Sequence, residues 1–286
     1  MKFINKNEID DIKGFVDFLK KSKKDFTVSQ TGYSLTVDFK GQQFMYIDKI
    51  TGGKCFASYN MIKRDILNSP VVIDNVPRST VRYYGVNQFI KNRRQLPDEV
   101  LNIDINSAYL TVLFNAGIIT QPTYEYVMKS GKNNRLKSVG MLATKRNVLT
   151  YKNGEMVNHN VITDSHLRNY FFYCCYEVGE IMNKIAGLLE KKFLFFWVDG
   201  IYCTPDTDSK QIVDALTERG FTSKVKHLNA CNFKTENDNL YFDYIDTDTL
   251  KRKTFCLPFE NEENNENIRQ FISILTKEQL TRFNTI

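Results

Sequence analysis

The sequence predicts an α+β protein in which an antiparallel sheet is backed by helices. Apolar residues recur at helical spacing between residues 163 and 192, whereas residues 32–48 alternate enough to predict two strands. The apolar run FLFFWV at 193–198 is typical of a buried strand, and Asp199 and Gly200 after it favour a hairpin turn. The predicted helix is packed in the core and leads directly into this strand.

The composition is that of a globular chain. It has 286 residues, of which 42% are hydrophobic, enough for one sizeable core or two modest ones. No segment approaches the roughly 18 to 20 uninterrupted apolar residues of a membrane span, and the N-terminus has no apolar signal-peptide core. The six cysteines lack the spacing of a zinc site, so we interpret them as reduced core residues. We therefore expect a cytoplasmic protein without a membrane partner.

A small N-terminal α+β domain is predicted for residues 1–77. Residues 7–24 have the apolar periodicity of an amphipathic helix. The two strands within residues 32–48 are expected to join around Lys40 and Gly41.

Two basic stretches lie on either side of Asp104 in the sequence. Residues 78–97 form a basic connector, in which Arg93 and Arg94 follow aromatic residues that are suited to stacking on bases. Residues 126–154 contain no acid and are suited to phosphate contact, with Lys145 and Arg146 as candidate DNA-binding residues. The basic residues of this second stretch are Lys129, Lys132, Arg135, Lys137, Lys145, Arg146 and Lys152.

Asp104 lies where a predicted strand meets a predicted helix. Residues 100–104 predict the strand, and SAYLTVLFNAG predicts a helix that Gly117 ends. Free backbone amides in the first turn of such a helix favour an anionic group beside the aspartate, such as a triphosphate.

Asp104 and Asp199 are the most informative pair in the chain. A carboxylate at the end of a strand and another at a hairpin tip can converge although they are far apart in sequence. Divalent ions need hard oxygen ligands on rigid elements. The pair therefore predicts a site for divalent metal ions.

The first motif, Asp104-Ile-Asn-Ser-Ala-Tyr109, resembles the D-x-x-S-L-Y element in the palm of family B DNA polymerases. The match is closest to the protein-primed members of phages and mobile elements. The resemblance implies that Asp104 binds both metals, with Ile105 beside it. It also implies that Asn106, Ser107 and Ala108 contact the triphosphate through their backbone, and that Tyr109 stacks under the sugar and excludes ribonucleotides.

Other elements resemble the same family. Trp197-Val-Asp199-Gly-Ile-Tyr202 is similar to its D-T-D-S-I-Y hairpin, with Asp199 as metal ligand and Trp197 replacing the first acid. Lys253-Thr-Phe255 is similar to its K-x-Y element, which holds the primer terminus. The family also grips the triphosphate with a lysine on a helix. Lys132, Arg135 and Lys137 are the candidates here, although the spacing differs and the accompanying tyrosine is absent.

The resemblance implies a reduced polymerase. The palm would span residues 98–258, with residues 126–154 as a fingers-like segment, and the short helical region 259–286 would form a vestigial thumb. The chain would lack the exonuclease domain. It would use two Mg²⁺ ions, with Mn²⁺ as a substitute, and bind primer, template and dNTP. A terminal protein or other replication proteins would be its partners, in the bacterial host cytoplasm if phage-encoded.

Two alternatives stay open. The small thumb is compatible with a primase-like or template-independent nucleotidyltransferase. The replacement of an acid by Trp197 is compatible with a non-catalytic palm that binds nucleic acid or serves as a replication accessory protein.

Overall fold

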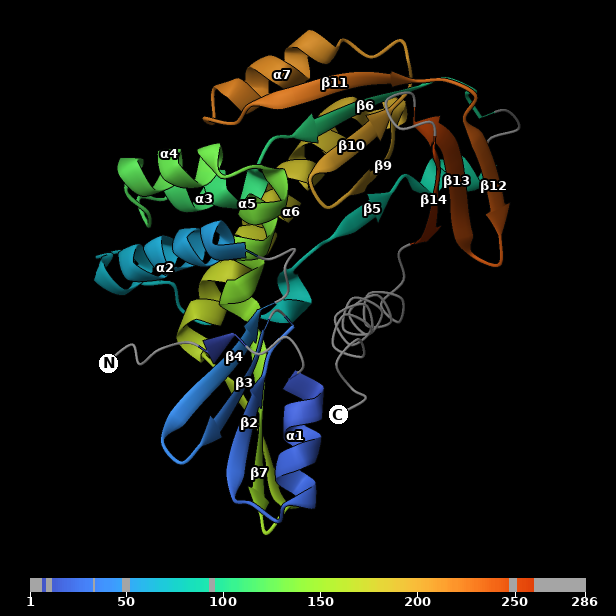
Figure 1. Cartoon of the computed structure of the whole chain (residues 1–286). Helices are drawn as coiled ribbons and strands as arrows, with labels where there is room; N and C mark the ends of the chain where they lie inside the picture. The colour runs from blue at the N-terminus through green and yellow to red at the C-terminus, as the bar shows by residue number, and fades with distance from the viewer. Residues whose placement is uncertain are drawn as a thin grey trace. The chain divides into compact units, whose positions relative to one another are not determined.

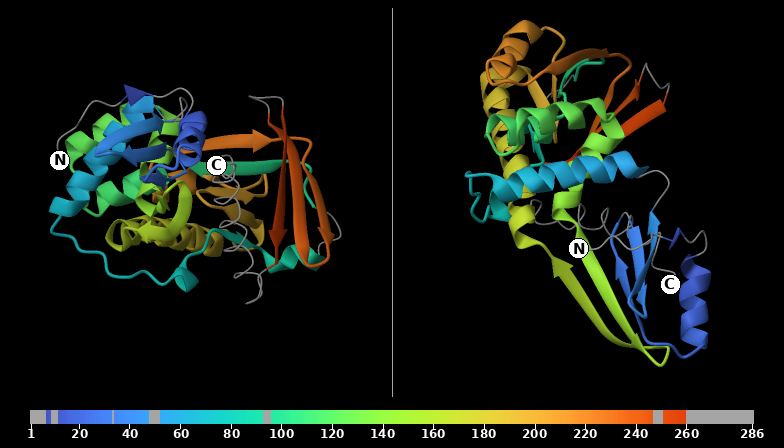
Figure 2. Two further views of the ribbon diagram at one scale, coloured as in Figure 1. Left: turned by 60° about the horizontal axis from the view of Figure 1, so that its bottom comes forward. Right: turned by 60° about the vertical axis from the view of Figure 1, so that its left-hand side comes forward.

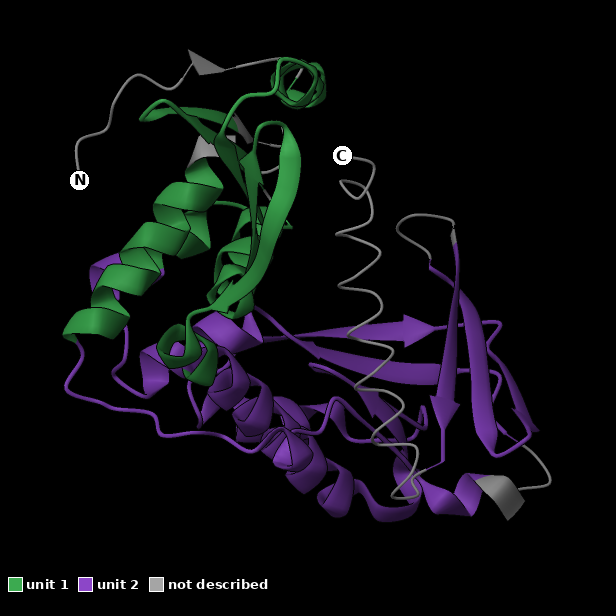
Figure 3. Cartoon of the chain, turned by 90° about the horizontal axis from the view of Figure 1, so that it is seen from below, with its two compact units in different colours: residues 1–68, 125–169, 270–286 green, residues 69–124, 170–269 purple. Residues whose placement is uncertain are grey.

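The computed structural model (Figure 1) describes residues 7–8, 12–32, 34–47, 52–92, 96–246 and 251–259. They form helices and mostly antiparallel sheets, which confirms the predicted α+β class. They divide into two compact units, one within residues 1–68 and 125–169 and the other within 69–124 and 170–269 (Figure 3). None of the helices in the described ranges is long and apolar enough to cross a membrane.

Unit 1 is built on a six-stranded sheet in the order β1-β4-β3-β2-β7-β8. Neighbouring strands are antiparallel except β1 and β4, which are parallel. The strands are β1 (Asn7–Glu8), β2 (Phe26–Gln30), β3 (Ser34–Phe39), β4 (Gln42–Ile47), β7 (Lys145–Lys152) and β8 (Glu155–Thr163).

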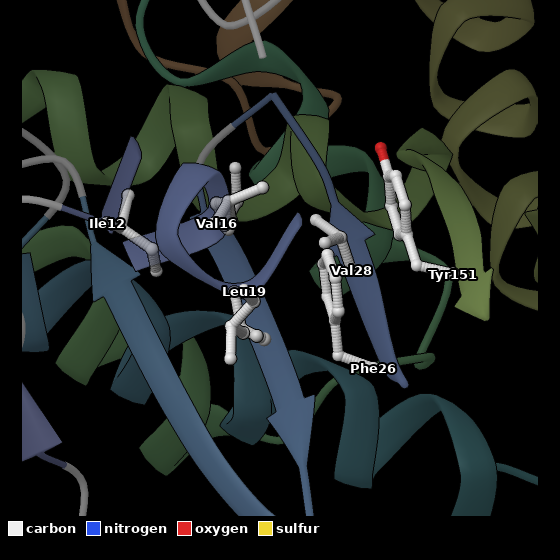
Figure 4. Close-up of a cluster of buried hydrophobic side chains, with 8 residues drawn as sticks. Ile12, Val16, Leu19, Phe26, Val28 and Tyr151 are labelled. Atoms are coloured by element: carbon white, nitrogen blue, oxygen red, sulfur yellow. The ribbon is translucent and has the colours of Figure 1, made fainter. Parts of the chain in front are cut away.

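Helix α1 (Ile12–Lys21) supplies the core of this sheet. Its buried residues Ile12, Val16 and Leu19 pack with buried side chains of β2, β3 and β7 (Figure 4). The rings of Phe26 and Tyr151 stack with centroids 4.4 Å apart. Because burying each large apolar side chain contributes about 1.5–3 kcal/mol, this cluster ties β7 firmly to the N-terminal strands.

The structure shortens one predicted element of unit 1 and confirms another. The helix predicted for residues 7–24 begins only at Ile12, because residues 7–8 form β1 and pair with β4. The hairpin predicted around Lys40 and Gly41 is confirmed. Both residues have positive φ, 52° and 74°, as a tight two-residue hairpin turn requires.

Helix α2 (Gly52–Asn68) packs on α5 (Lys132–Gly140) within the same unit. The Sγ atom of Cys55 lies 4.0 Å from the carbonyl oxygen of Asn134 and 3.9 Å from Sδ of Met141. The basic residues of α5 are therefore carried by unit 1.

Unit 2 contains a five-stranded antiparallel sheet in the order β11-β6-β10-β9-β5. Its strands are β5 (Tyr84–Val86), β6 (Val100–Ile105), β9 (Phe193–Trp197), β10 (Gly200–Cys203) and β11 (Ser223–Leu228). The associated helices are α3 (Ala108–Asn115), α4 (Gln121–Lys129), α6 (Ser165–Leu189) and α7 (Ser209–Thr217). The last residues of α4 and the first residues of α6 belong to unit 1. Short 3-10 helices span Arg78–Thr80, Gln88–Asn92, Met141–Ala143 and Glu190–Lys192.

The elements β6, α6, β9, β10, α7 and β11 follow the β-α-β-β-α-β order of a split β-α-β motif. One face of the sheet is apolar and buried, through Leu101, Ile103, Ile105, Phe196 and Ile201. The opposite face carries Asp104. A three-stranded sheet packs there, composed of β12 (Asn232–Glu236), β13 (Asn239–Asp246) and β14 (Lys251–Pro258).

The predicted domain boundaries differ from these units. Much of residues 126–154 belongs to unit 1 because α5 packs on α2 and β7 pairs with β2. The predicted connector, residues 78–97, contributes β5 to the sheet of unit 2. Residues 260–286, almost all of the predicted C-terminal region, lie outside the described residues, as do Arg93 and Arg94.

The cysteine prediction is confirmed with one exception. All six are free thiols, and five of them are buried. Cys256 is exposed because it lies on β14, an edge strand of the three-stranded sheet.

Candidate functional site

Cross-strand register aligns Asp104 with residues from every strand of the five-stranded sheet. The row runs Lys224, Asp104, Gly200, Trp197 and Tyr84 across β11, β6, β10, β9 and β5. Residues in one row share a face of the sheet. Asp104 is half-buried, so its carboxylate is positioned by the sheet yet accessible to a ligand.

Gly200 makes room for the carboxylate of Asp104. A Cβ atom at residue 200 would lie 3.3 Å from Oδ1 of Asp104 and 3.5 Å from Nδ2 of Asn102. Gly200 has no positive φ and begins β10, so the predicted Asp199-Gly200 turn is wrong by one residue. The turn is Val198-Asp199, because residue 200 already pairs with residues on both neighbouring strands.

Backbone hydrogen bonds hold the Val198-Asp199 turn on two sides. The amide of Val198 donates to the carbonyl of Tyr83 at 2.6 Å, and the amide of Ile105 donates to the carbonyl of Asp199 at 2.9 Å. Val198 has a φ of 53° and is the only β-branched residue with a positive φ in the described part of the chain. Such a conformation costs about 1–3 kcal/mol, and strain of this kind clusters at functional sites.

Replacing Val198 by asparagine is expected to raise the free energy of unfolding by about 1 kcal/mol, because asparagine tolerates the left-handed region. Urea denaturation measures the change. The matched control is Val213→Asn, at a half-buried position with helical backbone in α7, where the same exchange is expected to be destabilising. Equal losses in the two variants would show that Val198 is not strained.

Tyr109, on α3, lies close to the hairpin. Its ring packs edge-on against Phe171, with centroids 5.8 Å apart. Burial is the main reason that the pKa of Tyr109 lies well above its usual value, and the neighbouring thiol of Cys175 raises this pKa as well. The charge of Asp199 raises this pKa further. Burial also raises the pKa of Cys175 to about 11. Both groups therefore remain protonated at neutral pH, with the phenol within electrostatic reach of Asp199.

Tyr202 is affected by the charges of both aspartates. It lies on β10 and is buried. Burial is the main reason that the pKa of Tyr202 is raised, and the neighbouring Tyr244 raises it as well. The charges of Asp104 and Asp199 both add to the increase. The two carboxylates are therefore within electrostatic reach of one hydroxyl.

The predicted primer-holding residues lie on β14. The ring of Phe255 is 6.1 Å from that of Trp197 and 5.7 Å from that of Tyr202, so Phe255 adjoins the hairpin. Lys253 instead makes a 2.7 Å ion pair with the buried carboxylate of Asp246, which raises the pKa of Lys253. Trp197, where the resembling family has an acid, is thus part of an aromatic cluster.

The segment between β6 and α3 presents backbone amides without a side-chain cap. The amide of Asn106 donates to the carbonyl of Thr222 at 2.8 Å. Ser107 is the N-cap of α3, with a φ of 53°, and its side chain makes no capping hydrogen bond. The role expected for the first-turn amides at Ala108 and Tyr109, to bind an anion, stays a prediction.

The predicted phosphate-binding residues belong to the other unit. Lys132, Arg135 and Lys137 lie on α5, and Lys145 and Arg146 begin β7. The guanidinium of Arg135 donates through Nη1 to the carbonyl of residue 128 at 2.7 Å, a contact within its own segment.

Three residues around the aspartates were not predicted as site residues. Lys224 is the register neighbour of Asp104 only because β11 pairs with β6. Tyr83 supports the turn through its carbonyl, and Cys175 hydrogen-bonds with Tyr109. The alternation in SKVKHL at 223–228 signals a strand, but it does not identify the partner strand.

A scan against protein-family models and a search of curated proteins found no match for this chain. Within the described ranges, no group of three or more His, Cys, Asp or Glu side chains is placed to hold a metal ion. The candidate site therefore depends on the geometry around two carboxylates.

Proposed function

We propose that the chain is a template-directed DNA polymerase that adds deoxynucleotides to a primer 3′-hydroxyl by a two-metal mechanism. The observation that carries the proposal is the pairing of Asp104 with Gly200, which sets one carboxylate beside the turn that presents Asp199. The left-handed residues Ser107 and Val198 support it, since they lie in the two segments that resemble family B motifs.

The donor set fits Mg²⁺ ions that are shared with a nucleotide. Mg²⁺ is commonly held by one or two carboxylates together with substrate phosphates and water. Asp104 and Asp199, with the backbone of Ile105, would hold it, and Mn²⁺ would accept the same oxygen ligands. When bound, these ions would neutralise the triphosphate and activate the 3′-hydroxyl.

The chain's own residues would position the substrates around these carboxylates. The first-turn amides of α3 would bind the triphosphate. Tyr109, kept neutral by burial, would lie under the deoxyribose and exclude a 2′-hydroxyl, and Phe255 would contact the primer terminus. Basic residues of unit 1, including Lys145 and Arg146, would contact DNA phosphates. The reaction would take place in the cytoplasm, that of the bacterial host if the chain is phage-encoded, with a terminal protein or other replication proteins as partners.

Primer extension on templates of defined sequence tests the proposal. The wild type is expected to add the dNTP that the template specifies, in Mg²⁺ or Mn²⁺, and Asp104→Asn is expected to lose this activity. The matched control is Asp214→Asn, which removes one exposed carboxylate from α7 in the same unit and should extend primers at the wild-type rate. Incorporation that ignores the template, or that needs no primer, would favour the template-independent or primase-like alternative.

A second candidate function is a non-catalytic palm that binds nucleic acid. It is favoured by Trp197, whose ring packs on Tyr84 and Phe255 at the position of the first acid in the hairpin of the resembling family. A folded wild type that binds a primer–template but incorporates no nucleotide would establish this candidate and reject the first.

A further inference from the structure

Three turns of unit 1 meet at one end of its six-stranded sheet. The first residues of β2 pair with residues near the ends of β3 and β7, so the α1–β2 connection, the β3–β4 turn and the β7–β8 turn lie at the same end (Figure 2). Two hydrogen bonds join the first of these turns to the last. The amide of Asn153 donates to Oδ1 of Asp25 at 2.8 Å, and the amide of Gly154 donates to the carbonyl of Lys24 at 3.0 Å.

Lysines gather at this end of the sheet, which we call the lysine end. Its six lysines are Lys20, Lys21, Lys23, Lys24, Lys40 and Lys152. Among the ion pairs within the described residues, none includes any of the six. Residues 20–25, with four lysines and one aspartate, carry a net charge of +3, half of the +6 of the whole chain. Like charges that are held together repel one another, and an anionic partner would relieve this repulsion.

An exposed aromatic side chain adjoins the lysines. Phe18 is 60% exposed, although α1 buries its apolar residues Ile12, Val16 and Leu19 in the core of unit 1. Phe18 precedes Lys21 by three residues, so the two side chains are neighbours on the helix surface. Basic groups beside exposed aromatic rings are the combination that binds single-stranded nucleic acid, in which cations contact the phosphates and rings stack on the bases.

The lysine end is distant from the basic residues that the sequence predicts to bind DNA. Lys145 and Arg146 begin β7, whereas Lys152 ends it. A strand rises about 3.3 Å per residue, so the seven steps from Lys145 to Lys152 span about 23 Å. The lysine end would therefore be a second contact, separate from the first.

We propose that the lysine end binds single-stranded DNA, with its lysines on the phosphates and the ring of Phe18 stacked on a base. Contacts of this kind do not read the sequence. The choice of DNA as the strand rests on the proposed polymerase function. A lipid surface fits less well, because a helix that lies on a membrane inserts an apolar face, and the apolar face of α1 is buried in unit 1.

The salt dependence of binding to an oligo(dT) strand tests the role of the lysines. The full chain is used, without nucleotide or metal. Lys21→Gln/Lys24→Gln is expected to bind at least about fivefold more weakly and to lower the slope of log binding constant against log salt concentration by about 1.4, because each phosphate contact on a single strand contributes about 0.7. The matched control, Lys184→Gln/Lys210→Gln, removes two exposed lysines of unit 2 and should bind normally. An unchanged slope, or an equal loss in the control, would overturn the proposal.

Phe18→Ala separates stacking from charge. It is expected to weaken binding at least about fivefold and to leave the salt slope unchanged. Phe18→Trp should restore the affinity, since an indole also stacks on bases. Leu67→Ala removes another exposed apolar side chain of unit 1 and is the matched control. Wild-type affinity of Phe18→Ala for the strand would contradict the stacking. If these variants lost binding to phosphatidylserine vesicles but kept binding to oligo(dT), the lysine end would be a membrane contact instead.

The binding experiments do not depend on catalysis. A chain that binds oligo(dT) through the lysine end but incorporates no nucleotide would reject the polymerase and leave this proposal standing. A chain that extends primers, but whose Lys21→Gln/Lys24→Gln variant binds the strand like the wild type, would do the reverse.

Discussion

Replacement of Asp199 by asparagine is expected to reduce nucleotide incorporation at least about 100-fold while the fold stays intact. The side chains have the same size, and the turn is held by the backbone groups of Val198 and Asp199. Only the charge that would bind metal is removed. Loss of even an outer-shell partner of a metal ligand costs about 10–100-fold, so loss of a direct ligand should cost no less. Single-nucleotide incorporation on a primer–template measures the rate.

The double variant Asp104→Asn/Asp199→Asn is the sharper test. If Asp104 and Asp199 hold the same ions, losing the second carboxylate from an already inactive site should cost little more, because residues that act as a unit are strongly non-additive. Losses that multiply would instead indicate two independent roles and contradict a shared metal site. The free energy of unfolding of each variant is the control, and it should stay near that of the wild type.

The local parts of the site could be predicted from sequence because each has a signal within a dozen residues. FLFFWV is a buried strand, SAYLTVLFNAG has the pattern of a short helix, and both were found where expected. That is enough to set Asp104 at a strand end and Asp199 in a turn. It is not enough to identify the two turn residues. An aspartate before a glycine favours an Asp199-Gly200 turn, whereas Gly200 lies in β10 and leaves space for the carboxylate of Asp104.

The long-range parts could not be predicted from local patterns. β7 and β8 form a long hairpin, yet β8 has exposed residues on both faces and therefore lacks the alternation that marks a half-buried strand. The pairing of β7 with β2 and the packing of α5 on α2 show that the basic segment is built into unit 1. In the same way, Lys224 becomes a neighbour of Asp104 through strand pairing, a relation that one sequence does not reveal.

Gly179 of α6 is expected to tolerate no larger side chain. A Cβ atom there would lie 2.6 Å from the carbonyl oxygen of Arg82, and a backbone atom cannot move aside as a flexible side chain can. The guanidinium of Arg82 also donates to Oδ1 of Asn183, one turn further along the same helix, at 3.2 Å. Gly179→Ala is therefore expected to lower the free energy of unfolding by about 1–3 kcal/mol, the range for overpacking a close contact.

Gly187→Ala is the matched control for this prediction, because the same helix holds Gly187 with no atom within 4 Å of an added Cβ. There the exchange should raise the free energy of unfolding by about 0.5–1 kcal/mol, since alanine favours the helix. Urea denaturation of both variants should give changes of opposite sign.

The contact between Gly179 and Arg82 also bears on the candidate site. Tyr83 follows Arg82, and its carbonyl accepts a hydrogen bond from the amide of Val198 in the turn. Displacement of Arg82 should thus slow incorporation even where Gly179→Ala is fully folded, and Gly187→Ala should not. A Gly179→Ala protein as stable as the wild type would show that α6 does not pack closely on Arg82.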